Sequence, residues 1–447
     1  MTINIPSEVQ FIINTLEESG YEAYVVGGCV RDAVLGVEPK DWDICTSALP
    51  QQTINCFEGQ RIIETGLQHG TVTLLLNHTS FEITTFRVDG IYSDNRRPDK
   101  VDFVNDIKED LLRRDFTINA MAYNPTVGLV DFFGGLNDIN GKIIRCVGDA
   151  DKRFQEDALR VMRALRFASV LYFSIDENTS QAIHRNKSLL KNIAVERIAV
   201  ELNKLIIGRN VSDVLLQYHS VLTEFIPEIK NMVGFNQNNP YHHLDVWEHT
   251  VTSIAKATVN HVIRLSMLFH DIAKPLCYTE DERGGHFYGH PKVCSDMAKE
   301  ILQRLKYDND TIDAVTQLVL YHDAEIHPRK KHIKRWLNKI GELRLRQLLE
   351  IKFADANAQS PEFNQKKIDL LNAVAPVINE IMKQQQCFSL KDLAINGKDI
   401  IAAGVSEGVK VGVILNHLMD MVIDEQVEND KSKLLDVVNK LVHEINV

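Results

Sequence analysis

The spacing of hydrophobic residues changes near residue 141 and divides the chain into two kinds of structure. Before that point, short runs such as 71–76 and 81–86 are rich in Leu, Ile, Val, Phe and Thr. The second run alternates apolar and polar residues, as a strand with one buried face does. The segment 88–104 is rich in Asp, Gly, Ser, Asn, Arg and Pro, which predicts a long functional loop. The first part is therefore predicted to mix strands and helices.

Beyond residue 141, apolar positions recur with helical spacing almost throughout. Asn, Gln and Gly are concentrated over 231–239, immediately before Pro240, and this composition indicates a domain boundary. Helices rich in His and Asp are expected over 241–358, followed by a long amphipathic helix over 362–386. A compact helical tail is expected to complete the chain.

Composition narrows the class of protein. The chain has 447 residues, of which 25% are charged and 44% hydrophobic, which is ordinary for a globular protein of roughly three domains. Its net charge of −11 argues against nucleic-acid binding over the whole surface but allows a local basic groove. The seven cysteines form no CxxC pair, so no zinc ribbon is indicated. With no apolar run of membrane-spanning length and no leader pattern, a cytoplasmic protein without a membrane partner is expected.

A phosphate site is predicted where the segment 25–36 passes from a strand through a glycine turn into a helix. Gly27 and Gly28 allow backbone N–H groups to approach a phosphate, and Arg31 lies in the first helical turn, where anions bind well. Asp41 and Asp43 follow on a second expected strand, so that both face one pocket. Paired carboxylates are costly unless divalent cations separate them, which points to metal-dependent phosphoryl or nucleotidyl transfer. The alternative is a polar turn between strands.

Glu82 is a third candidate metal ligand. It occupies a lone polar position on the expected strand 81–86 and points away from Phe81 and Ile83. It completes a two-metal site with Asp41 and Asp43, or it belongs to an ordinary solvent-facing side of the strand.

The segment 113–123 carries a second set of candidates. Arg114 falls on a helical stripe with Ile118 and Met121, while Asp115 and Asn119 are separated by one helical turn. An arginine and an asparagine aimed at the pocket would bind the triphosphate and the ribose, with Asp115 bracing them. A helix cap formed by Asp115 is the simpler alternative.

A helix expected over 154–167 carries the acids Glu156 and Asp157, followed by Arg160, Arg163 and Arg166 at intervals of three residues. The two acids near its start are the only local partners of three arginines, and this positive excess suits a phosphate or a base better than a solvated face. A carboxylate accepts from an exocyclic amine and a guanidinium donates to a ring nitrogen or carbonyl. Asp157 with Arg160 would therefore admit C and A and reject U and G.

Six segments together resemble the class II tRNA nucleotidyltransferase and bacterial poly(A) polymerase family. They are GGCVRD (27–32), DWD (41–43), EITTFR (82–87), RRDFTIN (113–119), EDALR (156–160) and AVERI (194–198). The resemblance implies that the aspartates of the second segment bind catalytic Mg²⁺. It also implies that 113–119 contacts sugar and triphosphate, and that 156–160 reads the base.

The same resemblance implies an α+β architecture. The expected head, residues 1–140, is a polymerase-β-like nucleotidyltransferase domain on a five-stranded mixed sheet. An all-α neck over 141–230 would select the base and bind RNA, and an all-α body would cover 231–360. A helical tail over 361–447 would bind tRNA.

Activities within this family are divided into CCA, CC, A and poly(A) addition. The segment 88–100 resembles the flexible loop that complete CCA-adding members retain, and it favours CCA addition to tRNA from CTP and ATP. A-adding, CC-adding and poly(A) activities are the alternatives within the same class.

A second set of metal ligands is expected in the body. His249, His270-Asp271, His290, His322 and Asp355 form an ordered series of imidazoles and carboxylates, which suit a transition metal or magnesium. The series resembles the HD phosphohydrolase superfamily. That resemblance implies His249, His270, Asp271 and Asp355 as ligands of a second divalent metal, with His290 and His322 available for a further metal or a phosphate. This series supports one alternative to nucleotide addition, a metal phosphohydrolase whose front half binds RNA. A non-enzymatic RNA-binding scaffold is a further alternative.

Overall fold

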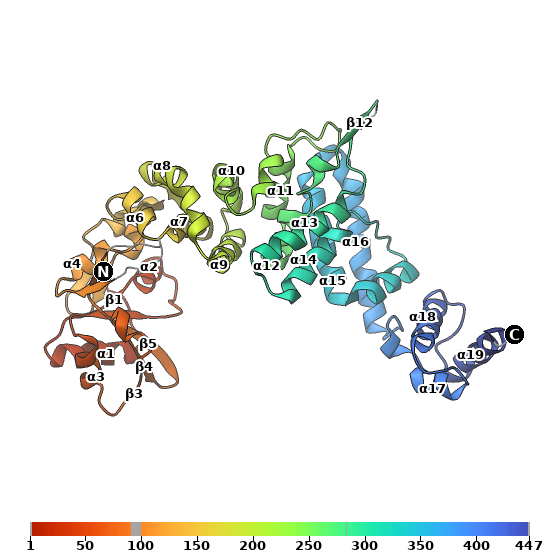
Figure 1. The fold of residues 1–447 in the computed structure, drawn as a ribbon, viewed down its shortest axis with the longest axis horizontal. Helices are drawn as coiled ribbons and strands as arrows, with labels where there is room; N and C mark the ends of the chain where they lie inside the picture. Colours follow the sequence, from red (N-terminus) through yellow and green to blue (C-terminus); the bar gives the residue numbers. More distant parts are fainter. Residues whose placement is uncertain (1, 91–99, 283, 446–447) are drawn as a thin grey trace. The chain divides into compact units, whose positions relative to one another are not determined.

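The computed structural model describes residues 2–90, 100–282 and 284–445, and the chain divides into two compact units. The first comprises Met1–Lys230 with Arg304–Tyr307, and the second comprises Asn231–Gln303 with Asp308–Val447. Apart from β12, the labelled strands lie in the N-terminal part of the ribbon, coloured red to orange, and helices dominate the rest (Figure 1). The four-part division expected from the sequence stays a prediction.

The N-terminal part is built on a mixed sheet that has seven strands within the described residues, in the order β3-β4-β5-β2-β1-β8-β9. All neighbouring pairs are antiparallel except β2 and β5, which are parallel. Residues of β1 and β2 such as Tyr24, Val26 and Cys45 pack against Phe86 and Leu111 in one core cluster. The strands are β1 (Ala23–Val26), β2 (Asp43–Thr46), β3 (Arg61–Ile63), β4 (Thr71–Leu76), β5 (Thr79–Thr85), β8 (Ala122–Asn124) and β9 (Gly128–Val130).

The expected α+β head is confirmed, but the expectation of five strands is wrong. The edge strands β3 and β9 have three residues each, too few to give an alternating pattern that can be recognised in the sequence. The two ends of the expected loop 88–104 are strands and not loop, because β6 (Arg87–Asp89) pairs with β7 (Val101–Phe103). Residues 91–99, which carry most of the resemblance to a flexible loop, lie outside the described residues.

Helices of the first unit surround this sheet and continue beyond it. They are α1 (Ser7–Glu18), α2 (Gly28–Val34), α3 (Pro50–Cys56), α4 (Ile107–Leu112), α5 (Gly135–Gly141), α6 (Ala150–Glu156), α7 (Leu159–Leu171), α8 (Glu177–Asn186), α9 (Val195–Ile206) and α10 (Val211–Leu222). The single helix expected over 154–167 is interrupted. Asp157 has extended backbone angles (φ −134°, ψ 103°) between α6 and α7, and its carboxylate accepts a hydrogen bond from the Leu159 N–H. Aspartate competes with helical hydrogen bonds in this way, which explains the break.

The second unit is largely helical, as expected. Its helices are α11 (Val246–Lys256), α12 (His261–Phe269), α13 (His290–Arg304), α14 (Asn309–Tyr321), α15 (Lys330–Ala358), α16 (Pro361–Lys383), α17 (Gly397–Ala402), α18 (Val409–Ile423) and α19 (Lys431–Ile445). The all-α expectation misses a hairpin of β12 (Thr279–Asp281) and β13 (Gly284–His286) here, and the short parallel pair β10 (Ile143–Ile144) and β11 (Ser174–Ile175) in the first unit. These strands of two or three residues are too short to show a period.

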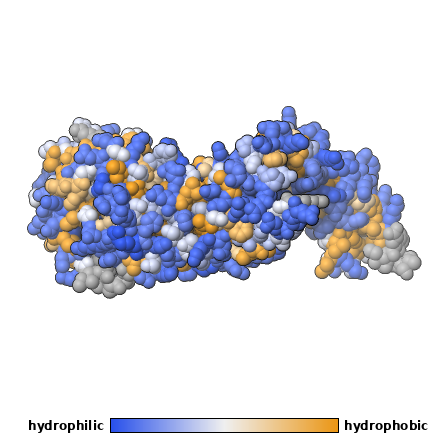
Figure 2. Space-filling view, turned by 90° about the horizontal axis from the view of Figure 1, so that it is seen from above, coloured by the Kyte–Doolittle hydropathy of each residue, from blue (hydrophilic) through white to orange (hydrophobic). Residues whose placement is uncertain are grey.

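The face of the molecule in Figure 2 is predominantly hydrophilic, with apolar residues in separate patches. Within the described ranges, no helix combines the length and the apolar composition that crossing a bilayer requires.

Candidate functional site

Two carboxylates lie side by side at the parallel pair of strands in the head, and a third precedes them in the chain. The register places Asp43 of β2 beside Glu82 of β5, with both side chains exposed, while their neighbours Ile44 and Ile83 are buried. Asp41 was expected on the strand but lies in the bend before it, because β2 begins only at Asp43.

Asp41 is nevertheless close enough for its charge to act on Asp43. The pKa of Asp43 is raised, first by desolvation and then by the negative charges of Asp41 and Glu82, whereas the Arg114 guanidinium acts in the opposite direction. Mutual repulsion between carboxylates is relieved when divalent cations bind between them. The carboxylates of Asp41, Asp43 and Glu82 are therefore suited to bind Mg²⁺.

The glycine turn makes room for an arginine. Gly27 has φ +84°, and a Cβ atom at this position would lie 2.9 Å from Nη1 of Arg114. The Arg114 Nη2 group donates to Asp110 at 3.2 Å, and within the described structure its buried Nε has no hydrogen-bond partner. A guanidinium held beside the turn and close enough to act on Asp43 is suited to bind a phosphate.

Asp110 is a residue that the sequence interpretation missed. Its buried carboxylate also accepts from Nε and Nη2 of Arg113 at 3.0 and 2.8 Å. Burial favours the neutral acid, but the charges of Arg113 and Arg114 outweigh burial and lower the pKa of Asp110. The spacing of an acid three and four residues before two arginines was a signal that could have identified it.

The segment 113–123 is not a helix, contrary to expectation. After α4 ends at Leu112, only the 3₁₀ turn Thr117–Asn119 precedes β8. The expected contact between Asp115 and Asn119 forms all the same, with Asn119 Nδ2 donating to Asp115 Oδ1 at 3.1 Å.

This contact belongs to a chain of four predicted residues. Nη1 of Arg31 donates to Asn119 Oδ1 at 2.7 Å, and Nε of Arg163 donates to Asp115 Oδ2 at 2.8 Å. Burial raises the pKa of Asp115, but the Arg163 charge and the Asn119 hydrogen bond hold it well below its ordinary value. Asp115 is therefore an ionised anchor for side chains from two other elements.

The arginines of α7 have more partners than their own helix supplies. Arg160 is buried, pairs with Glu156 at 2.8 Å, and donates to the Arg113 carbonyl at 2.9 Å. Nε of Arg166 lies 3.2 Å from Oε2 of Glu201 on α9. The inferred excess of positive charge on α7 is thus smaller than the local sequence indicated, because acids from distant segments pair with these arginines.

Asp157 stands at the junction of α6 and α7. Its Oδ2 atom lies 3.2 Å from Nη2 of Arg197 on α9. In this structure the two expected base-reading residues, Asp157 and Arg160, thus each contact another protein side chain.

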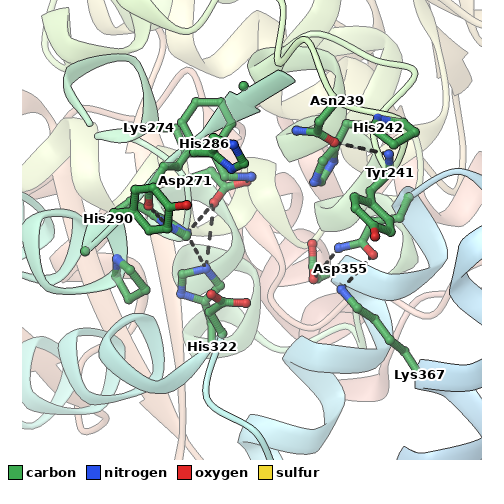
Figure 3. A pocket seen from close by; sticks show the side chains of 18 residues that line it. Asn239, Tyr241, His242, Asp271, Lys274, His286, His290, His322, Asp355 and Lys367 are labelled. Carbon is green, nitrogen blue, oxygen red and sulfur yellow. Dashed lines mark hydrogen bonds and ion pairs between the residues drawn. The ribbon is translucent and has the colours of Figure 1, made fainter. Parts of the chain in front are cut away.

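The second unit brings all six predicted His and Asp residues together. One group comprises His249, His270 and Asp355, and a second comprises Asp271, His290 and His322. Within the first group, Nε2 of His249 lies 3.0 Å from Asp355 Oδ1 and 3.4 Å from Nε2 of His270. Asp271 joins the groups, since its Oδ2 lies 3.2 Å from Nε2 of His270 and its Oδ1 lies 3.5 Å from Nε2 of His290. Figure 3 shows His290 and His322 pointing toward Asp271.

The imidazoles are oriented as metal ligands. Nδ1 of His270, His290 and His322 contacts the carbonyls of Met267, Phe287 and Val319 at 2.6, 2.8 and 2.7 Å. A carbonyl only accepts, so each Nδ1 carries a proton and each Nε2 faces the centre, where it can bind a metal once it is unprotonated. Burial, followed by the charge of His270, lowers the pKa of His322 to about 3 and keeps that ring neutral. Facing lone pairs 3.2 Å apart on His290 and His322 fit a cation between them.

A cavity of about 570 Å³ opens onto this centre. Lys274 lines it and lies 2.7 Å from Asp271 Oδ2, and Lys367 lines it on the side of Asp355 (Figure 3). The exposed ring of Tyr288 stacks on His286 at the rim. The cavity therefore combines cations and aromatic surface with the two ligand groups.

Comparisons with known proteins agree with this picture. Residues 23–145 match the family model described as the poly A polymerase head domain. Residues 172–233 match a model for a probable RNA and SrmB-binding site of polymerase A, and 290–438 match a putative tRNA nucleotidyltransferase domain 2. None of these three descriptions refers to a phosphohydrolase.

Full-length relatives decide the family. The CCA-adding enzyme of Pediococcus pentosaceus is 33% identical over 97% of this chain and 98% of its own length. The CCA-adding enzyme of Limosilactobacillus reuteri is 35% identical over 97% of this chain and 96% of its own length. The chain belongs to the CCA-adding enzyme family. It is a nucleotidyltransferase, as its sequence predicted.

Solved structures of CCA-adding enzymes show the same fold. The enzyme of Bacillus stearothermophilus in complex with CTP has a TM-score of 0.74 and 28% identity, covering 99% of this chain and 100% of that one. The Thermotoga maritima enzyme complexed with tRNA has a TM-score of 0.59 and 20% identity, covering 98% of this chain and 96% of that one. The α+β head followed by helical parts is thereby confirmed.

Proposed function

We propose that this chain adds C, C and A to the 3′ end of tRNA from CTP and ATP, without a nucleic-acid template. The observation that carries the proposal is the adjacent pair Asp43 and Glu82, with the charges of Asp41 and of Arg114, which is held beside the Gly27 turn, acting on Asp43. Relatives of similar length named CCA-adding enzymes, one of them solved with CTP and another with tRNA, support this choice of substrates.

Each residue group has a distinct part in the proposed reaction. Asp41, Asp43 and Glu82 would hold Mg²⁺, which when bound lowers the pKa of the attacking 3′ hydroxyl and neutralises phosphate charge. The Gly27–Gly28 turn and Arg114 would bind and orient the triphosphate. Arg31 and Asn119 would contact phosphate and ribose, and Asp115 would hold Asn119 and Arg163 in position.

Base selection is assigned to Asp157 and Arg160. Asp157 would release Arg197 to accept from the exocyclic amine of C or A, and Arg160 would donate to the adjacent ring nitrogen. Uracil and guanine present the reverse order of donor and acceptor, so they would leave buried groups unpaired. Charge and hydrogen bonding at the junction of α6 and α7 would thus replace a template strand.

The test supplies purified enzyme with a tRNA that ends at the discriminator base, with each nucleotide separately and with all together. We expect two additions from CTP alone and a third when ATP is also present. Extension that stops at CC, or that begins only on tRNA ending in CC, would rule out full CCA addition. Extension from ATP alone would favour an A-adding or poly(A) activity.

The metal-binding role predicts the effect of Asp43→Asn. Replacing the carboxylate by an amide of equal size should lower incorporation of CMP by about 100-fold or more, because charge stabilisation at the transferred phosphate is lost. Asp213→Asn, on an exposed face of α10, is the matched control and should retain full activity. Single-turnover rates on radiolabelled tRNA measure both. Full activity in Asp43→Asn would remove this aspartate from the catalytic set.

We further propose a metal-dependent phosphohydrolase activity in the second unit. The supporting observation is the inward orientation of the histidine Nε2 atoms around Asp271, beside a cavity that carries Lys274 and Lys367. Divalent metal held by the two ligand groups would supply a bound hydroxide and polarise a phosphoryl oxygen. Lys274 would keep Asp271 ionised and in place through their 2.7 Å contact.

This activity is tested with His270→Ala and bis(4-nitrophenyl) phosphate as the probe. Elemental analysis should find divalent metal in the wild type and less in the variant, and hydrolysis should fall by about 100-fold. Nucleotide addition should be unchanged, and His261→Ala, an exposed histidine at the start of α12, should alter neither property. A wild type that binds no divalent metal in this unit would refute the proposal.

A further inference from the structure

One of the two lysines in the cavity of the second unit, Lys367, has a charge that no carboxylate balances. The other, Lys274, is buried between internal partners, since it lies 2.7 Å from Asp271 Oδ2 and donates to Gln237 Oε1 at 3.0 Å. Lys367, by contrast, is exposed and forms no ion pair with any residue that the structure describes. Its ammonium group donates to a neutral acceptor, Oε1 of Gln359, at 2.9 Å. The positive charge is therefore available to an anionic ligand.

Gln359 connects this lysine to a proposed metal ligand. Its Nε2 group donates to Asp355 Oδ2 at 2.9 Å, while Asp355 Oδ1 lies 3.0 Å from Nε2 of His249. An ammonium group only donates and a carboxylate only accepts, so a group between them must accept on one side and donate on the other. An amide does both. A single side chain thus separates the charge of Lys367 from the first group of metal ligands.

The turn that carries Gln359 is fixed by packing. Gln359 is 6% exposed, and only Ser360 separates it from α16. The Ser360 N–H donates to the Tyr241 carbonyl at 2.9 Å, and the ring of Phe363 on α16 meets the ring of Tyr241 edge-on, with centroids 5.1 Å apart. Lys367 therefore extends toward the cavity from a well-anchored first half of α16.

Lys367 also lies where two cavities meet. A smaller cavity of about 370 Å³ adjoins the one of about 570 Å³, and the described residues that line both are His322, Asp323, Asp355 and Lys367. Figure 3 shows the ammonium end of Lys367 directed toward Asp355. A ligand that approaches the metal ligands through either cavity therefore meets this lysine.

A phosphoryl group suits this arrangement. Divalent metal held by the two ligand groups would bind some of its oxygens, and a further oxygen would accept from Lys367. The lysine would then exchange a neutral amide acceptor for a charged one, and hydrogen bonds to charged groups are the stronger kind. A neutral solute would gain nothing from this exchange.

We propose that Lys367 binds a phosphoryl oxygen of the substrate of the second unit, and that Gln359 is a positioning residue that holds both Lys367 and Asp355. The inference rests on the phosphohydrolase activity proposed for this unit. It adds a substrate-binding residue from α16, a helix that carries none of the His and Asp ligands.

The variant Lys367→Met tests the phosphate contact, because it removes the charge and nearly keeps the length of the side chain. KM for bis(4-nitrophenyl) phosphate should rise about 10-fold, because one hydrogen bond to a charged group is lost. The Kd for inorganic phosphate, measured by calorimetry on the metal-loaded protein, should rise by a similar factor. The kcat value and the content of divalent metal should stay unchanged.

Two further variants of α16 serve as comparisons. Lys367→Arg retains the charge and should keep most of the phosphate binding. Lys366→Met alters the neighbouring exposed lysine, which lines neither cavity, and should bind phosphate as the wild type does.

The variant Gln359→Met tests the positioning role. It should lower the affinity for divalent metal by about 10-fold, because Asp355 loses the donor that orients it. It should also weaken phosphate binding, because Lys367 loses its acceptor. Metal titration of the metal-free protein measures the first effect, and Asn357→Met, an exposed position near the end of α15, is the control. Nucleotide addition should be unchanged in every variant.

Each part of the proposal has its own contradicting result. Unchanged phosphate binding in Lys367→Met would refute the phosphate contact, and loss of metal from that variant would make the lysine a structural residue instead. Unchanged metal affinity in Gln359→Met would remove its positioning role. Failure of the proposed function is distinguishable, because a wild type that binds metal and phosphate without hydrolysing the diester would still show the effect of Lys367→Met on the Kd for phosphate.

Discussion

Two buried aspartates orient the arginines of the head, and neither needs to touch a nucleotide to do so. Asp110 accepts from Arg113 and Arg114, and Asp115 accepts from Asn119 and Arg163. Both carboxyl groups have lowered pKa values because the arginine charges outweigh the cost of burial. The arginines are thereby fixed before a ligand arrives, which reduces the entropy lost on binding.

The selectivity assigned to Asp157 is a property of one side chain and predicts a specific defect. In Asp157→Ala, the ratio of CMP to UMP incorporation should fall by about 10-fold or more, because the acceptor that distinguishes an amine from a carbonyl is lost. Metal dependence should be unaltered. Competition between CTP and UTP on one tRNA measures the ratio.

Asp151→Ala is a suitable comparison for this variant, since Asp151 is paired with Arg185 at 2.6 Å on α8, away from the break between α6 and α7. It should keep the ratio of the wild type. An unchanged ratio in Asp157→Ala would assign base selection to other residues.

At the scale of elements, the turn between β1 and α2 depends on a glycine for two separable reasons. Gly27 has φ +84° and lies against Arg114, whereas Gly36, after α2, has φ +72° and open space where a Cβ atom would lie. Gly27→Ala and Gly36→Ala should each lower the free energy of unfolding by about 1–2 kcal/mol, because both backbones are strained for alanine.

Only Gly27→Ala should also raise KM for CTP, because its methyl group displaces Arg114. Thermal unfolding and steady-state kinetics on the two variants separate backbone strain from the clash. Equal KM values in both would mean that Arg114 does not bind the nucleotide.

Element boundaries were the least predictable part of the sequence, for identifiable reasons. Asp157 was expected inside a helix, but its carboxylate accepts from the Leu159 N–H at the start of α7, and the helix is broken there. Residues 113–123 show helical spacing, yet Phe116 pairs with Cys146 in a β-bridge, a contact that local periodicity does not contain. In both places a tertiary or side-chain interaction overrides local preference.

At the scale of the whole molecule, the residues able to bind a metal were easier to predict than the ion-pair partners of the arginines. The six His and Asp residues of the second unit were recognised from their order, and the structure brings them into two adjoining groups. The partners of the α7 arginines were not recognised, because Glu201 and Asp115 come from distant segments. A sequence shows which groups can react, while the fold determines which of them are already paired.

The two proposed catalytic centres lie in different compact units. The carboxylates of the head belong to Met1–Lys230, and the His and Asp groups belong to the unit formed mainly by Asn231–Gln303 and Asp308–Val447. Each centre is built from side chains of its own unit, so a variant in one is expected to leave the chemistry of the other intact.

Because Asp43 and Glu82 are brought together by the parallel register of β2 and β5, the presence of both sequence motifs does not by itself guarantee activity. Glu82 stands beside Asp43 only because the ladder pairs these two positions, and a slip of one residue would bring the side of Phe81 and Ile83 there instead. A deletion of one residue early in β5 would therefore abolish metal binding, although the sequence of each of the six segments that resemble the family would be unchanged. Genomic surveys that score such segments one by one would count that chain as active, and only the distance between them would reveal the loss.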